Sequence, residues 1–343
     1  MGLTALAVPS IVAVARHKGL YGTVREKKPD LKEIPTLGGV AIFAGTTVSM
    51  NLFVDPVSMP ELPYLLAGIL IVFLIGLRDD ILFTKPIWKL TGQSAAALVL
   101  VAAGGLRIAD PGSFFGLELN GGFPEIFFTV FLMVGVINSY NLIDGIDGLA
   151  SGTGMLSALV FGLVFYGEGM YEWAMMAGIL TGSLAAFTWF NVFGRRNKIL
   201  MGDTGSLMLG FMLSAMAVRF LKLDSPRFLN WQISDPLAFS LSVLLVPLFD
   251  TLRIILIRIY RGQSPLHPDR KHIHYRLIDT GFTHLQASGL LISFNLAMIV
   301  LAVVLQGLGE PTLLLILLGV PGLLSFLPGI YLKKRRKQKQ EQS

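Results

Sequence analysis

Cysteine is absent from this 343-residue chain, and charged residues make up only 15% of it. Without thiols there are no disulfides, no thiolate nucleophile and no zinc–thiolate site, so any metal must be held by oxygen or histidine ligands. A soluble domain usually carries about 25% charged residues. This chain is instead 53% hydrophobic, with a mean hydropathy of +0.66. The composition therefore predicts a membrane protein.

Apolar stretches approaching the roughly 20 residues that cross a bilayer recur along the whole chain. The first is short enough to suggest a signal peptide, but no basic residue precedes it and a basic loop follows it, which favours a spanning helix. The predicted fold is an all-α polytopic bundle, one domain over 1–343 with a basic tail at 333–343. The eleven predicted spans are 2–16, 38–54, 62–78, 91–106, 125–140, 150–166, 172–192, 204–221, 238–259, 284–306 and 312–332.

The loops between these spans differ in charge from side to side. One side holds 23 of the 28 Lys and Arg residues, and the other holds Arg107, Arg219, Lys222 and Arg227. Because basic loops stay in the cytoplasm, we expect the N-terminus outside and the C-terminus inside. The tail from Lys333 suits an anionic inner leaflet, as a stop-transfer anchor or a lipid site. Basic residues confined to short loops do not favour nucleic-acid binding.

Carboxylates gather at the ends of the predicted spans on the basic side. Asp79 and Asp80 end the third span, Asp144 and Asp147 follow the fifth, and Asp203 precedes the eighth. A carboxylate beside a membrane span is costly and is commonly functional. If the bundle brings these groups together, several carboxylates without cysteine suit a hard cation such as Mg²⁺.

Each acidic motif also has a structural interpretation. Asp203 is suited to cap the eighth helix. Asp144 and Asp147 either share one helical face or form a turn with the glycines beside them. Asp79 and Asp80 are consistent with a plain interfacial boundary. Three such motifs on one side favour the functional interpretation.

The loop before the tenth span is rich in histidine and basic residues, which are suited to binding a diphosphate. A transition-metal site at the His-x-His pair and a merely solvated basic loop are the alternatives. Lys85 and Lys89 are further candidate donors, although Lys89 is also suited to anchoring its helix at the headgroups. The residues of the loop and its flank are His267, Arg270, Lys271, His272, His274, Arg276 and His284.

Together these motifs resemble the polyprenyl-phosphate N-acetylhexosamine-1-phosphate transferases, of the glycosyltransferase family 4 type. The resemblance covers nearly the whole chain, and motif order matches as well. Its most specific element is Asn-Leu-Ile-Asp-Gly-Ile-Asp-Gly-Leu-Ala. The motifs are Pro35–Gly39, Asp79-Asp80, Asn141–Leu149, Gly202–Leu207 and the loop at 264–277.

The last loop separates two branches of that family. The peptidoglycan branch, which uses UDP-MurNAc-pentapeptide, typically carries three consecutive histidines. This chain reads His272-Ile273-His274-Tyr275, which is more similar to the GlcNAc-1-phosphate branch and its usual His-Ile-His-His. Tyr275 takes the place of the last histidine, a departure that bears on the choice of sugar.

The resemblance implies a phosphotransferase reaction at the cytoplasmic face of a bacterial inner membrane. UDP-GlcNAc and undecaprenyl phosphate give undecaprenyl-diphosphate-GlcNAc and UMP, the first membrane step of teichoic acid, O-antigen or a similar surface glycan. The implied cofactor is Mg²⁺, with Mn²⁺ as an alternative. A homodimer is a further expectation.

The resemblance also implies roles for individual residues. Asp203 is expected to bind the metal, with Asp79 and Asp144 as further ligands. Asp79 and Asp80 are expected to assist the lipid phosphate, one of them as its base. His272 and His274, grouped with the catalytic residues, are expected to contact the diphosphate or the sugar. The expected substrate-binding residues are Lys32, Asn141, Asp144, Asp147, Arg270, Lys271 and Arg276.

Two other classes of protein fit parts of the pattern. A transporter for a nucleotide sugar or lipid needs many spans, but its site usually lies near the bilayer midplane, whereas these carboxylates lie at span ends. A structural scaffold leaves the acidic motifs without a purpose. Within the family, direct attack by the lipid phosphate is favoured over a covalent aspartyl intermediate, because a lipid phosphate is already mostly ionised at neutral pH.

Overall fold

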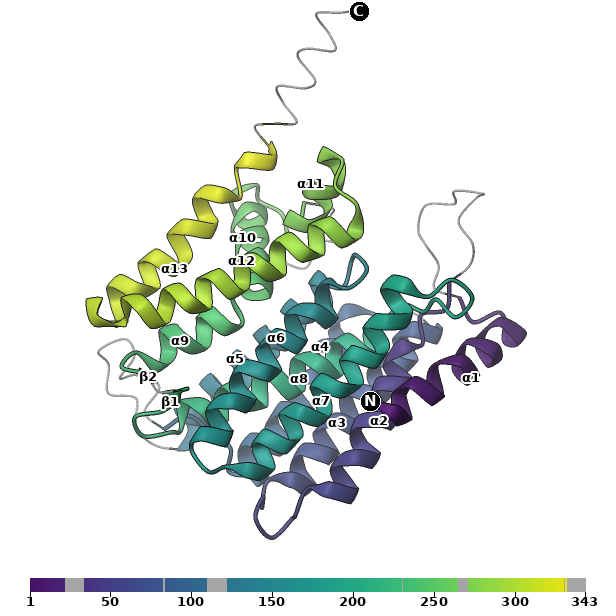
Figure 1. The fold of residues 1–343 in the computed structure, drawn as a ribbon, viewed down its shortest axis with the longest axis horizontal. Helices are drawn as coiled ribbons and strands as arrows, with labels where there is room; N and C mark the ends of the chain where they lie inside the picture. Colours follow the sequence, from purple (N-terminus) through teal and green to yellow (C-terminus); the bar gives the residue numbers. More distant parts are fainter. Residues whose placement is uncertain are drawn as a thin grey trace, which may run out of the picture.

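The computed structural model describes residues 1–21, 34–82, 84–109, 122–229, 231–264, 271–329 and 331 (Figure 1). Short π-helical segments extend α4 and α7, and a 3-10 turn follows α12. Two short antiparallel strands pair Phe228 with Trp231. The helices are α1 (Gly2–Lys18), α2 (Gly38–Phe53), α3 (Leu62–Leu82), α4 (Pro86–Leu98), α5 (Gly122–Ile143), α6 (Leu149–Gly167), α7 (Tyr171–Thr188), α8 (Gly202–Leu221), α9 (Pro236–Val243), α10 (Leu245–Tyr260), α11 (Ile273–Thr280), α12 (His284–Leu305) and α13 (Glu310–Leu324); the short elements are η1 (Val99–Ala103), η3 (Trp189–Phe193), η4 (Gln306–Leu308), β1 (Arg227–Phe228) and β2 (Trp231–Gln232).

The all-α prediction is confirmed, and each of the eleven predicted spans coincides with a helix or a pair of helices. Within the described ranges, six helices are long and apolar enough to cross a membrane, or seven if the bent pair α9 and α10 counts as one span. The count of eleven and the orientation of the termini stay predictions. Lys32, His267, Arg270 and the tail at 333–343 lie outside the described residues.

Helix α8 forms the centre of the bundle. Nearly all of its side chains are buried, and α2, α3, α5 and α6 pack against it. Two close approaches depend on glycine: a Cβ added to Gly39 would lie 2.1 Å from the backbone nitrogen of Gly205, and one added to Gly76 would lie 2.5 Å from Thr204 Cα. Small residues let helix backbones meet closely in membrane proteins. The site at the start of α8 is therefore held by direct backbone contact.

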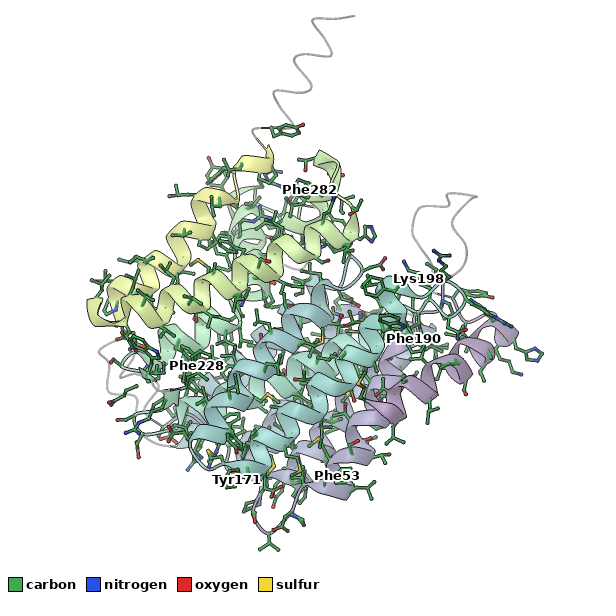
Figure 2. All side chains as sticks on the ribbon, viewed as in Figure 1. Phe53, Tyr171, Phe190, Lys198, Phe228 and Phe282 are labelled. Carbon is green, nitrogen blue, oxygen red and sulfur yellow. The ribbon has the colours of Figure 1, made fainter. Side chains whose placement is uncertain are left out.

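Large apolar side chains cover the outside of the bundle, as expected of a surface that faces lipid. Leu6, Leu74 and Leu315 are among those exposed. Figure 2 places Lys198 at one end of the bundle and Tyr171 at the other. The acidic motifs lie at the end that carries Lys198, because Asp147 binds that lysine.

The chain bends sharply between α9 and α10, by 86°. Helices α9 and α10 pack with α12 and α13 on one side of the bundle, coloured green to yellow in Figure 1. Helix α10 also contacts α5. The bend therefore turns α10 toward the end of α5, where the acidic turn at 144–147 begins.

Candidate active site

The glycine-rich turn at 35–39 pairs with the segment that leads into α8. The backbone N–H of Gly38 donates to Leu200 O at 2.9 Å, and that of Gly39 donates to Met201 O at 2.9 Å. Gly202, the first residue of α8, has a φ of +72°, which only glycine adopts readily. A Cβ there would lie 2.1 Å from Thr36 O. This turn therefore positions the N-terminus of α8.

A carboxylate from another helix caps α8. Asp80, near the end of α3, accepts hydrogen bonds from the backbone N–H of Asp203 at 2.8 Å and of Thr204 at 2.9 Å. The hydroxyl of Thr204 donates to it as well, at 2.5 Å. The alternative interpretation of Asp203 as the cap is thus wrong: Asp203 lies in the first turn of α8, and Asp80 satisfies the free N–H groups. Asp203 is left to make other contacts.

A lysine joins two of the predicted catalytic carboxylates. Lys89 Nζ lies 2.6 Å from Asp79 Oδ2 and also forms an ion pair with Asp203. The other oxygen of Asp79 accepts from the N–H and hydroxyl of Thr84, both at 2.6 Å. Asn141 Nδ2 donates to Asp203 Oδ1 at 3.0 Å. The structure thus brings Asp79, Asp203 and Asn141 together around one ammonium group.

Asp144 and Asp147 lie in a turn between α5 and α6, so the turn interpretation is confirmed and a shared helical face is wrong. Asp144 accepts a hydrogen bond from the backbone of Gly202. Burial raises the pKa of its carboxyl to about 8, and the negative charges of Asp203, Asp80 and Asp147 add to the shift. Asp79, Asp80, Asp144 and Asp203 together are called the acidic cluster, in which Lys89 pairs with Asp79 and Asp203.

Asp147 points to a different set of partners. Its Oδ2 lies 2.6 Å from Lys198 Nζ and 3.3 Å from His284 Nδ1. Burial by itself would raise the pKa of Asp147, but the hydrogen bonds from His284 and Lys198 hold it below its usual range. Asp147 thus links the turn to Lys198 and to α12.

Two charged residues inside a predicted span fix the start of α11. Asp250 Oδ2 lies 2.8 Å from His272 Nδ1, and its Oδ1 accepts from Arg253 at 2.8 Å and from the N–H of Ile273 at 3.1 Å. Asp250 and His272 are both buried. Arg253 also donates to the carbonyl of Lys271 at 2.7 Å. Residues 271–273 are therefore tied to α10 from several directions.

His274 lies directly against the acidic turn. A Cβ added to Gly145 would lie 2.5 Å from His274 Nε2 and 2.7 Å from the hydroxyl oxygen of Tyr275. The rings of His272 and His274 are near-parallel, with centroids 5.5 Å apart. Burial lowers the pKa of His274 to about 4, so its imidazole is neutral at pH 7. Its Nε2 is buried and has no hydrogen-bond partner among the described residues.

The predicted site residues therefore do not all meet in one place. Asn141 binds Asp203 of the acidic cluster, and His274 lies against Gly145 of the neighbouring turn. In contrast, His272 faces Asp250 and Asp147 faces Lys198. Arg276 approaches the segment that follows α13, where a Cβ on Gly329 would lie 3.7 Å from its guanidinium. Sequence reasoning missed Lys198, Asp250 and Arg253. Asp250 and Arg253 are charges within the apolar stretch 238–259, a signal that commonly marks function in membrane proteins.

The donor set of the acidic cluster fits a hard divalent cation. Its oxygen ligands are of the type that Mg²⁺ prefers, and Lys89 supplies one positive charge among its four carboxylates. Within the described ranges, no three His, Asp or Glu groups are already arranged around a metal position. Lys89 instead holds Asp79 and Asp203, so a cation would share these carboxylates with the ammonium group or displace it.

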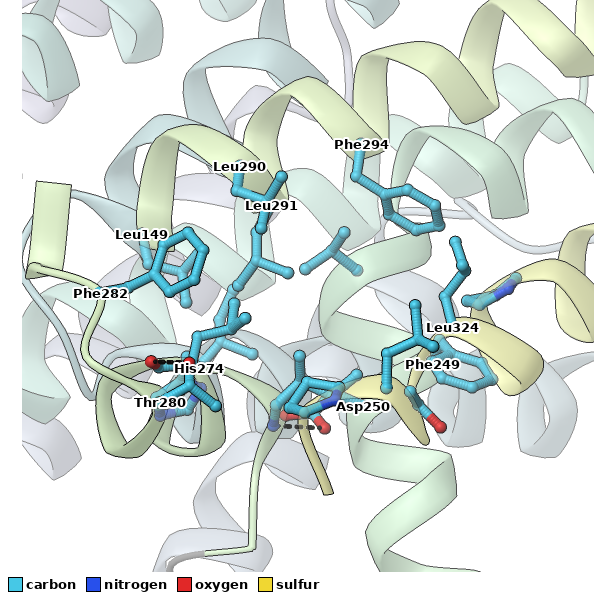
Figure 3. A pocket seen from close by; sticks show the side chains of 18 of the residues that line it. Leu149, Phe249, Asp250, His274, Thr280, Phe282, Leu290, Leu291, Phe294 and Leu324 are labelled. Carbon is cyan, nitrogen blue, oxygen red and sulfur yellow. Dashed lines mark hydrogen bonds between the residues drawn. The ribbon is translucent and has the colours of Figure 1, made fainter. Parts of the chain in front are cut away.

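An apolar cavity of about 600 Å³ adjoins the acidic turn. Ile143 and Leu149, on either side of that turn, form part of its wall. Figure 3 shows Leu290 and Phe294 of α12 across the cavity from His274. Several of its lining side chains are partly exposed, so the cavity is open at the surface. It has the size and lining of a site for an apolar ligand.

Comparison with known proteins places these features in a family. The model of glycosyl transferase family 4 matches residues 62–221. The undecaprenyl-phosphate alpha-N-acetylglucosaminyl 1-phosphate transferase of Escherichia coli (strain K12) is 30% identical over 277 residues, 80% of this chain and 73% of that protein. The decaprenyl-phosphate N-acetylglucosaminephosphotransferase of Mycolicibacterium smegmatis is 32% identical over 309 residues, which cover 83% of this chain and 75% of that protein. The chain belongs to glycosyl transferase family 4, and the resemblance found in the sequence is confirmed.

Proposed function

We propose that the chain transfers N-acetylglucosamine 1-phosphate from UDP-GlcNAc to undecaprenyl phosphate, releasing UMP, in a bacterial inner membrane. The observation that carries this proposal is the convergence of the acidic cluster and Lys89 next to the turn at 144–147, which adjoins an apolar cavity and against which His274 lies. The names of both relatives support a polyprenyl phosphate acceptor and an N-acetylglucosamine phosphate group. The surface polymer fed by the product is proposed to be teichoic acid, O-antigen or a similar glycan.

The acidic cluster is proposed to bind Mg²⁺ through Asp203, Asp79 and Asp144. Mg²⁺ supplies positive charge that offsets the negative charge of the two phosphate substrates. Lys89 holds two of these carboxylates in place, and Asn141 orients Asp203 through its hydrogen bond. Phosphoryl transfer depends mainly on positioning and electrostatics, which such a set of residues supplies.

Contacts of the carboxylates support direct attack by the lipid phosphate. Both oxygens of Asp80 accept hydrogen bonds from α8, and one oxygen of Asp79 accepts two from Thr84 while the other binds Lys89. A carboxylate engaged in this way is a weak nucleophile, so a covalent aspartyl intermediate is disfavoured. In this proposal the acceptor oxygen attacks the β-phosphorus of the donor, and the bond to UMP breaks.

The apolar cavity supports a lipid acceptor. It begins at Ile143 and Leu149, the residues that flank the acidic turn, so a polyprenyl chain lying there would place its phosphate beside the cluster. His274 lines the cavity, and its Nε2 has no hydrogen-bond partner in the part of the chain that the structure describes. In this proposal, that nitrogen is available to a polar atom of either substrate.

The test is transfer of labelled sugar phosphate by purified protein in detergent, with and without Mg²⁺. We expect lipid-linked product and UMP from UDP-GlcNAc only when the metal is present. A parallel reaction with UDP-MurNAc-pentapeptide tests the peptidoglycan branch. A transporter would convert neither donor under these conditions, because no compartments exist.

Paired variants connect the reaction to the site. Asp203→Asn should abolish turnover in a protein that stays folded. Asp55→Asn is the matched control, because Asp55 is a carboxylate that bonds to residues of its own turn, between α2 and α3. Retention of most activity by Asp203→Asn would contradict the assignment.

A further inference from the structure

The bend between α9 and α10 leaves backbone groups without their usual helical partners. Pro247 has no N–H, so the carbonyl of Val243 loses the bond it would receive in a continuous helix. The residue before a proline is disfavoured in helical conformation, and Val246 N–H does not reach Ser242 O. A buried backbone group without a partner is costly, above all within a membrane.

One side chain of α12 takes over these bonds. Asn295 Oδ1 accepts from the N–H of Val246 at 3.0 Å, and Asn295 Nδ2 lies 3.3 Å from Ser242 O and 3.2 Å from Val243 O. Its carboxamide thus satisfies three backbone groups at the bend, the N–H of Val246 and the carbonyls of Ser242 and Val243. Asn295 is 1% exposed. Ser157 of α6 adds a hydrogen bond to Val243 O at 2.9 Å.

The bend lies about one helical turn before Asp250, the residue that binds His272. Asp250 follows Val246 by four residues, a rise of about 6 Å along α10. Asp250 binds His272 at 2.8 Å. His274, two residues after His272, lies against the acidic turn. A change in the direction of α10 would therefore move both histidines relative to the acidic cluster.

We infer that Asn295 is a positioning residue, which holds the broken helix at the angle at which Asp250 binds His272 and His274 lies against the acidic turn. It lies away from the reacting groups and acts through α10. The kinetic consequence rests on the proposed transfer reaction, whereas the consequence for the angle of α10 does not.

The absence of cysteine allows the angle to be measured directly. Cysteines placed at Tyr260, 93% exposed at the end of α10, and at Tyr166, 67% exposed on α6, give one pair of spin labels. The parent should show one narrow distribution of distances between the two labels, and Asn295→Leu should shift or broaden that distribution. Asn295→Asp keeps the acceptor for Val246 N–H and should change the distance less.

Transfer kinetics of the same proteins form the second arm. Displacement of catalytic groups by about 1 Å can cost about 10²-fold in rate. We expect a loss of kcat of about that size in Asn295→Leu and a smaller loss in Asn295→Asp. Thr4→Val is the matched control, since it removes a buried hydrogen bond between α1 and α7, to Ser183. It should change neither the distance nor kcat by more than about twofold.

Each outcome has a definite meaning. An unchanged label distance in Asn295→Leu overturns the inference, and so does a changed distance with kcat within twofold of the parent. If the parent itself gives no transfer from UDP-GlcNAc, the proposed function fails, and the label distance alone then decides whether Asn295 sets the angle of α10. A loss of kcat that Asn295→Asp partly restores, together with the distance change, supports the inference.

Discussion

Substitutions at Asp80 test whether a carboxylate of the site stabilises the fold or takes part in the reaction. Its carboxylate accepts hydrogen bonds from the N–H groups of Asp203 and Thr204 and from the hydroxyl of Thr204. Replacing it by alanine leaves two N–H groups at the start of α8 without a partner. Because α8 is the buried centre of the bundle, that change should destabilise the whole protein.

The expected magnitude follows from the hydrogen bonds and the charge that the substitution removes. Removing a helix cap costs about 0.5–2 kcal/mol, and a negative charge at a helix N-terminus contributes up to about 1 kcal/mol. We therefore expect Asp80→Ala to lower the free energy of unfolding by about 2–3 kcal/mol. In a chain of 343 residues that corresponds to about 3–4 °C in the unfolding midpoint. Asp80→Asn keeps one acceptor oxygen and should lose about half as much.

The assay is thermal unfolding in detergent, followed by the fluorescence of the four tryptophans, together with the transfer assay. Asp203→Asn serves as the comparison, because the Asp203 carboxylate is partly exposed and its ion pair should contribute less than about 1 kcal/mol. We expect Asp80→Asn to retain more transfer activity than Asp203→Asn, each measured well below its own midpoint.

The reasoning is refuted if Asp80→Ala unfolds at the parent's midpoint, or if Asp203→Asn is the less stable of the two. In the first case, water or another group must satisfy the N-terminus of α8. In the second, the ion pair with Lys89 must support the fold more than the cap does.

Two further predictions concern packing and pH. Gly39→Ala should prevent stable folding, because its Cβ would lie 2.1 Å from Gly205 N. Gly178→Ala is the control, since nothing lies within 4 Å of the Cβ added there. Equal yields of folded protein from the two variants would contradict this prediction. Without metal, the raised pKa of Asp144, about 8, means that the folded state holds a proton that the unfolded chain releases near pH 4. The free energy of unfolding should therefore fall as pH rises from about 4 to about 8. Asp144→Asn should flatten this dependence of unfolding free energy on pH. An equally steep dependence in that variant would exclude Asp144 as the cause.

Hydropathy and short motifs predicted most of the architecture. The eleven apolar stretches coincide with helices because a hydrophobic run of that length has few alternatives in a bilayer. The acidic motifs at the span ends predicted a single site, since charges at a membrane boundary lie where the helices end. The roles of His272, His274 and the metal ligands were implied by family resemblance, and they stay predictions.

Only the tertiary structure decided which partner each charged group takes. Asp79 and Asp80 are adjacent in the sequence, yet one binds Lys89 and the other caps α8, because neighbouring residues on a helix point in different directions.

The same holds for the bend at Pro247. A proline in a span predicts a break, but its angle depends on Asn295, which follows 48 residues later in the chain. Contacts between segments so far apart leave no local pattern. Local sequence therefore determined the helices and the chemistry available, and packing around α8 and α10 determined which side chains meet.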